Sequence, residues 1–131
     1  MLHRRDFAPE ARPPLTGLRV VDLSRLVAGN MVSLQLADHG AEVIKVEDPA
    51  KGDPLRAWRV QGHSLHWKIY ARNKRSLALN LRDPEGLALL ADLLATADVP
   101  IENFRPGTLE AMGLAPATLW AGNPKLIVLR V

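Results

Sequence analysis

The chain has 131 residues, 47% hydrophobic and 24% charged, which is typical of a folded domain that needs neither a metal nor disulfides to form a core. It contains 17 basic and 14 acidic residues, a net charge of +3, and the absence of cysteine excludes disulfides, cysteine metal sites and thiol catalysis. No apolar run approaches the roughly 20 residues that a membrane span requires, so no membrane partner is expected.

The first residues differ from the rest of the chain. Residues 1–14 combine charged side chains with Pro13 and Pro14 and lack the apolar core of a secretory signal, which predicts a mobile N-terminal arm. Residues 15–131 are predicted to form a folded domain. The sequence ends inside the last predicted strand, so this domain is expected to be partial at its C-terminus.

Apolar or alternating segments predict five strands, over residues 18–23, 42–46, 76–81, 98–102 and 125–131. Helices are predicted over residues 31–39, 84–97, 106–112 and 117–121. Asp83 can cap the longest helix and Pro84 suits its first position, whereas Pro100 is awkward in a central strand. The alternation predicts an α/β fold, Rossmann-like, with a mostly parallel sheet and helices on both faces.

Ligands of such sheets bind beyond the carboxyl ends of the strands. The segments that follow the first four predicted strands are therefore the first places to look for function: residues 24–30, 47–56, 81–83 and 102–107. Gly29 lies between the first strand and helix, where a small residue lets the backbone approach a ligand or simply make a turn. No Gly-x-Gly-x-x-Gly dinucleotide motif is present.

The positive charge is concentrated in one stretch. From Pro54 to Arg82 there are seven basic residues and no Asp or Glu, which leaves ten basic and fourteen acidic residues elsewhere. A stretch of this length predicts contact with an anion. Within it, residues 72–76 hold three cations that could bind phosphates or form a solvated turn. The four histidines are scattered, and no metal site is expected.

These segments, taken together, resemble the family III coenzyme A (CoA) transferases, which include formyl-CoA transferase and carnitine CoA-transferase. The resemblance covers nearly the whole chain, from Pro14 to Val131. It is carried, in family order, by residues 14–20, 27–29, 36–47, 52–53, 72–76, 97–107 and 123–124. The resemblance implies that the chain is the N-terminal portion of such an enzyme, within a cytoplasmic, interlocked homodimer.

The resemblance also implies where CoA or an acyl-CoA substrate would lie. Val27 and Ala28 would line the CoA site by their backbone. Leu79, Asn80 and Arg82 would flank the nucleotide. Asn103, Phe104 and Arg105 would border the path of the pantetheine arm.

The chain departs from the family pattern at several positions. Asn30 replaces a proline, Asp48 stands where a basic residue can meet the nucleotide, and Ala111 stands where an arginine is frequent. The catalytic aspartate that forms an aspartyl-CoA intermediate would lie beyond Val131, so no catalytic residue is assigned and this chain alone is expected to be inactive.

Two other functions remain open at the level of the sequence. A racemase of the same fold would act on a 2-methylacyl-CoA instead of transferring CoA to a carboxylic acid. A non-enzymatic module would bind a nucleotide or nucleic acid through the basic stretch. A transferase that binds no nucleic acid is the favoured hypothesis.

Overall fold

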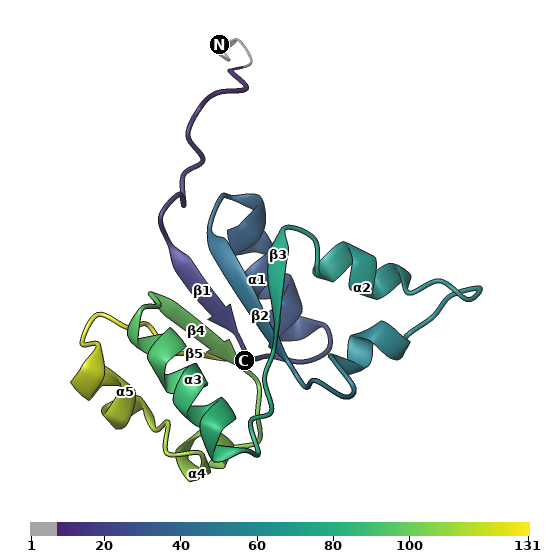
Figure 1. Cartoon of the computed structure of the whole chain (residues 1–131). Helices are drawn as coiled ribbons and strands as arrows, with labels where there is room; N and C mark the ends of the chain where they lie inside the picture. Colours follow the sequence, from purple (N-terminus) through teal and green to yellow (C-terminus); the bar gives the residue numbers. More distant parts are fainter. Residues whose placement is uncertain (1–7) are drawn as a thin grey trace.

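The computed structural model describes residues 8–131, which form a five-stranded parallel sheet with helices on both faces (Figure 1). The predicted arm lies partly outside this range, because residues 1–7 are not among the described residues. Residues 8–14 are exposed. Within residues 8–131, no helix has the length and apolarity needed to cross a membrane.

The strands follow the order β3-β2-β1-β4-β5, and every neighbouring pair is parallel. Their bounds are β1 Arg19–Asp22, β2 Glu42–Glu47, β3 Lys74–Ala78, β4 Val99–Glu102 and β5 Leu129–Arg130. This arrangement confirms the predicted α/β fold with a parallel sheet.

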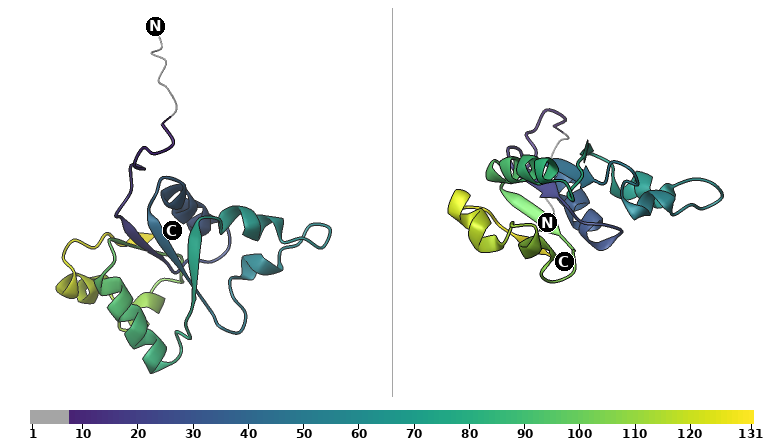
Figure 2. Two further views of the ribbon diagram at one scale, coloured as in Figure 1. Left: turned by 45° about the horizontal axis from the view of Figure 1, so that its top comes forward. Right: turned by 60° about the horizontal axis from the view of Figure 1, so that its bottom comes forward.

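The helices connect these strands across the two faces. Their bounds are α1 Ala28–Asp38, α2 Leu65–Tyr70, α3 Pro84–Ala95, α4 Thr108–Ala111 and α5 Pro116–Gly122, with a short 3-10 helix at Pro54–Ala57. The stretch that contains the 3-10 helix and α2 projects from the side of the sheet (Figure 2). The sequence pattern did not predict either of these two helices.

Two hydrophobic cores form because successive strand residues point to opposite faces. Val20 packs with Ala37 of α1 in one core, whereas the adjacent Val21 packs with Leu90 of α3 in the other. Both valines are fully buried. The second core also receives side chains from α4 and α5, so the helices after β3 and β4 share one cluster.

The predicted start of α3 is confirmed in detail. The Asp83 side chain accepts a hydrogen bond of 3.0 Å from the backbone N–H of Glu85, and Pro84 occupies the first position. This cap satisfies a backbone donor that the helix itself leaves free.

Most other element bounds differ from the prediction by a few residues, and β3, α1 and β5 are examples. Strand β3 begins at Lys74, two residues early, because the ladder with β2 pairs Lys74 with Val43. Helix α1 begins at Ala28. Strand β5 is only two residues long, and its ladder with β4 starts at Ile101, one residue beyond Pro100. The Ile101 carbonyl accepts from the Leu23 N–H just beyond β1, so the adjacent Pro100, which has no N–H to donate, faces β5 just before that ladder begins.

Candidate functional site

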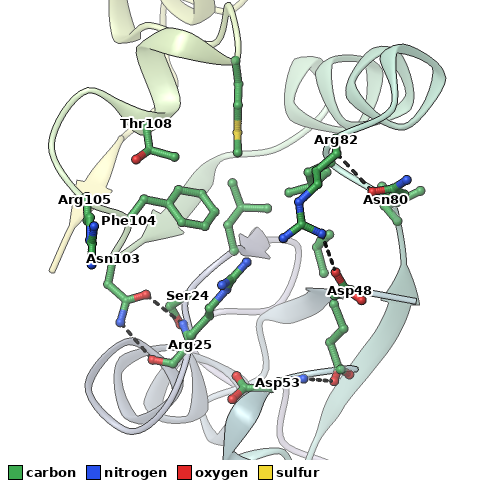
Figure 3. A pocket seen from close by; sticks show the side chains of 17 residues that line it. Ser24, Arg25, Asp48, Asp53, Asn80, Arg82, Asn103, Phe104, Arg105 and Thr108 are labelled. Carbon is green, nitrogen blue, oxygen red and sulfur yellow. Dashed lines mark hydrogen bonds and ion pairs between the residues drawn. The ribbon is translucent and has the colours of Figure 1, made fainter. Parts of the chain in front are cut away.

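The sheet order creates a point where the two halves of the fold diverge. The chain leaves β1 for β2 on one side, and leaves β3 for β4 on the other, so the loops after β1 and β4 separate. Asn103 joins these two loops: its Oδ1 accepts from the Arg25 backbone N–H at 2.8 Å, and its Nδ2 donates to the Arg25 carbonyl at 2.9 Å (Figure 3).

A cavity of about 520 Å³ opens at this carboxyl edge. This volume is within the roughly 300–1,000 Å³ range of small-molecule sites. The carboxyl end of every strand from β1 to β4, or the segment after it, contributes to the lining: residues 23–25, then 46–48 with 52 and 53, then 79–82, then 103–105 with 108 and 112. The structure therefore brings together residues from all four segments that the strand pattern indicated.

The two ends of the cavity carry different groups (Figure 3). At one end the Arg25 guanidinium lies 5.9 Å from the centre of the Phe104 ring, with Arg105 also in the lining. At the other end Arg82 lies 3.5 Å from a carboxylate oxygen of Asp48. Arginine and aromatic side chains suit a ligand that combines anionic groups with a flat ring.

Six of the eight predicted binding residues line this cavity: Leu79, Asn80, Arg82, Asn103, Phe104 and Arg105. Val27 and Ala28 do not line it. Val27 precedes α1 and Ala28 is the first residue of that helix, with its side chain exposed. A role for their backbone in ligand binding stays a prediction.

The packing of the fold requires glycine at position 29, for a reason that the sequence did not indicate. A Cβ atom at this position would lie 2.2 Å from the Ser24 Cβ, so only glycine allows the start of α1 to approach the end of β1. The close approach is between two protein segments.

A buried charged network lies beneath the loops that form the cavity. Asp22 is fully buried, and the Lys45 and Lys74 side chains are only 2% exposed. Lys45 Nζ lies 3.4 Å from Asp22 and 3.2 Å from Asp53. Lys74 Nζ lies 3.2 Å from the other Asp22 oxygen. Two ammonium groups and two carboxylates make the network neutral, as burial of charge demands.

Asn30 connects this network to the loop after β1. Its Nδ2 donates to Asp53 at 2.8 Å and to the Leu26 carbonyl at 2.5 Å, and its Oδ1 accepts from Lys74 at 3.1 Å. The Leu26 backbone N–H also donates to Asp53, at 3.1 Å. Asn30 and Asp53 therefore tie the loop after β1 to the loop after β2, and so hold two walls of the cavity together.

Glu47, the last residue of β2, is held by its own ion pair. Arg56 donates to both of its carboxylate oxygens, at 2.7 and 2.9 Å. Burial favours the neutral acid, but hydrogen bonds from Arg56, from Ser76 and from the Asp53 backbone outweigh it and lower the pKa of Glu47 to about 2. This carboxylate is ionised at neutral pH and serves the fold.

Most cations of the basic stretch have a carboxylate partner within this chain, so contact of the stretch with an external anion stays a prediction. Five of them pair with carboxylates of this chain that lie outside the stretch: Arg56–Glu47, Arg72–Asp38, Lys74–Asp22, Arg75–Glu42 and Arg82–Asp48. Of these five cations, only Arg82 lines the cavity. Residues 72–76 thus stabilise the fold through partners that are distant in sequence.

The sequence did not single out Arg25 or the buried network. Arg25 is a cation in the loop that follows the first strand, and that placement alone was an available signal. Lys45 sits within an apolar strand, where a charged residue indicates burial with a partner, but its partners are 23 residues before it (Asp22) and 8 residues after it (Asp53). Asp22, the last residue of β1, has a structural role because it pairs with both buried lysines.

Comparison with known proteins identifies the family of this chain. Residues 15–131 match the model of CoA-transferase family III. A succinyl-CoA–D-citramalate CoA-transferase from Chloroflexus aurantiacus is 51% identical over 121 residues, which covers 90% of this chain and 30% of that protein. A succinate–glutarate CoA-transferase from Agrobacterium fabrum is 45% identical, and the match covers 91% of this chain and 32% of that protein.

A similar fold is found in a solved structure of a CAIB/BAIF family protein from Brucella suis. It superposes with a TM-score of 0.85 at 42% identity, over 92% of this chain and 33% of that one. The chain thus spans about a third of the length of the relatives it matches.

Proposed function

The chain belongs to CoA-transferase family III, and from this membership we propose that it forms the CoA-binding part of an enzyme that transfers CoA between carboxylic acids. The observation that carries the proposal is the convergence of four strand ends on one cavity. Three arginines in its lining can pair with phosphates, and Phe104 offers an apolar surface to the rest of the ligand.

We assign the ligand contacts within this proposal to the two ends of the cavity. Arg82, with Leu79 and Asn80, would meet the nucleotide, and Asn103 to Arg105 would border the pantetheine arm. Val27 and Ala28 would contribute backbone groups from the start of α1. A transferase is preferred over a racemase of the same fold because the relatives described above are named CoA-transferases.

The nucleophile of the proposed reaction would be an aspartate outside this chain, which forms an aspartyl-CoA intermediate. Three carboxylates line the cavity, and two of them support this assignment. Glu47 is bound by Arg56, Asp53 is bound by Lys45 and Asn30, and both are buried. A nucleophilic carboxylate must reach the substrate carbonyl, so neither of these two is available for the reaction.

We further propose a dicarboxylic acyl donor or acceptor, on the model of the succinyl and succinate groups in the names of the two relatives. The complete enzyme would act as an interlocked homodimer. The 131-residue chain alone would bind CoA but catalyse no acyl transfer.

Calorimetric titration of the chain with CoA and with duplex DNA tests the binding proposal. CoA should bind and DNA should not, because most cations of the basic stretch are already paired. Tight DNA binding at moderate salt without CoA binding would contradict the proposal.

Two asparagines provide a matched pair of variants for this titration. Asn103 joins two backbone segments through its amide and lines the cavity. Asn123 makes a similar bridge, accepting from Lys125 N–H and donating to the Ala97 carbonyl at 2.8 Å, away from the cavity lining. Asn103→Ala should weaken CoA binding roughly tenfold or more, whereas Asn123→Ala should leave it unchanged. Equal effects would show that the cavity is not the CoA site.

A further inference from the structure

We propose that Asp48 is a specificity-determining residue that disfavours a phosphate on the ribose of the nucleotide bound in the cavity. This inference rests on the proposed CoA binding and concerns which nucleotide the cavity selects. CoA carries a phosphate on the ribose 3′-oxygen. The inference predicts that the chain prefers CoA over the same molecule without this phosphate less strongly than the arginines of the cavity alone would suggest.

The position of Asp48 in the fold is the first argument. Asp48 directly follows β2 and lines the cavity. In doubly wound sheets of this strand order, an acidic residue at the corresponding place accepts hydrogen bonds from a ribose hydroxyl. Glu47 precedes it but is bound by Arg56 and Ser76. Asp48 is therefore the carboxylate at this corner that remains able to meet a ligand.

The geometry of Asp48 is the second argument. Its Oδ1 accepts from the backbone N–H groups of Ala50, at 2.9 Å, and Lys51, at 3.0 Å, which fixes the side chain. These two backbone donors, together with Arg82, hold the pKa of Asp48 below its usual value. The carboxylate is consequently anionic at neutral pH, and its other oxygen, Oδ2, faces Arg82 (Figure 3).

The pairing with Arg82 is the third argument. The 3.5 Å separation is longer than the roughly 2.7–2.9 Å of a strong charge-assisted hydrogen bond, and the Arg82 side chain is 83% exposed. Arg82 can therefore turn to a ligand, but a phosphate that reaches it also meets the Asp48 charge. A ribose hydroxyl would instead donate to Oδ2. The pair thus favours a hydroxyl over a phosphate at this corner.

The test compares CoA with dephospho-CoA, which has a 3′-hydroxyl in place of the 3′-phosphate. Both are titrated calorimetrically into the wild-type chain and into Asp48→Asn, at fixed ionic strength. The Asn side chain keeps an oxygen for the Ala50 and Lys51 donors, and its NH2 group replaces Oδ2, which removes both the charge and the acceptor for a ribose hydroxyl. The ratio of CoA affinity to dephospho-CoA affinity should rise about five- to tenfold in the variant. Asp92→Asn makes the same charge change at an exposed position on α3, outside the cavity lining, and should leave the ratio unchanged.

Each result of these titrations either supports or overturns the role proposed for Asp48. A higher ratio in Asp48→Asn alone supports the inference, and a smaller difference between the variants at high salt supports its electrostatic origin. If both ligands bind but the ratio does not change, the inference is overturned and the proposed function stands. If the wild-type chain binds neither ligand, the proposed function fails, and the inference fails with it.

Discussion

Replacing Asp22 by Asn removes one of the two negative charges from the buried network beneath the cavity. Asp22 is fully buried, and the two lysines that it contacts are only 2% exposed, so water cannot compensate for the loss. Removal of one partner from a buried ion pair destabilises a protein by about 3–5 kcal/mol. The free energy of unfolding of a small domain is about 5–15 kcal/mol, so this one substitution should remove a large part of the stability.

A second substitution separates the effect of charge balance on stability from the other effects of Asp22→Asn. Lys74→Met removes one ammonium group, and the double variant with Asp22→Asn again leaves one positive and one negative charge in the network. Burial lowers the pKa of Lys74, and Asp22 opposes this effect, which indicates that the two groups are energetically coupled. The double variant should be less destabilised than the sum of the single variants by about 1–3 kcal/mol.

Urea unfolding followed by tryptophan fluorescence measures these free energies, because the chain has three tryptophans. Asp92→Asn, on the exposed surface of α3, is the matched control and should change stability by no more than about 0.5 kcal/mol. The reasoning is refuted if Asp22→Asn costs less than about 1 kcal/mol, or if the two network substitutions are additive.

The remaining predictions concern Glu47 and Gly29. The pKa of Glu47 is about 2 in the folded chain and its ordinary value is 4.5, so its contribution is complete above pH 4.5 and is lost as the pH falls toward 2. Because Arg56 is partly exposed, we expect about 2 kcal/mol from this carboxylate. Other carboxylates also titrate in this range, so urea unfolding should show a loss of stability in both proteins that is smaller in Glu47→Gln by about this amount. Gly29→Ala would place a Cβ atom 2.2 Å from the Ser24 Cβ and should destabilise the chain by about 1–3 kcal/mol. Gly122→Ala, where no atom lies within 4 Å of the added Cβ, is its control in thermal unfolding, and equal melting temperatures for the two variants would contradict the packing argument.

The parts of the fold that depend on local pattern were predictable from the sequence. The cap at Asp83 and Pro84 marks the start of α3 because the interactions involved lie within three residues. The apolar strand with Val20 and Val21 indicated burial on both faces, and the two hydrophobic cores confirm it. The carboxyl edge as the location of a site followed from the parallel sheet, without knowledge of any side-chain contact.

The parts that depend on distant partners were not predictable in the same way. The basic stretch looked unpaired because no acid lies within it, yet Arg72 meets Asp38 and Lys74 meets Asp22 across 34 and 52 residues. Likewise, the sequence left Gly29 open to two interpretations, a backbone that approaches a ligand or a plain turn, and did not indicate that its neighbour in space is Ser24. Charge counted along a sequence therefore does not locate free charge in a folded structure.

An amide NMR titration of the chain with CoA tests the central claim most directly, because it shows where on the structure the ligand binds. The account predicts that chemical-shift changes concentrate at the four strand ends, at residues 24–25, 48–53, 79–82 and 103–105, and that α5 is unaffected. Shift changes confined to the basic stretch near α2, or no changes at millimolar CoA, would contradict it.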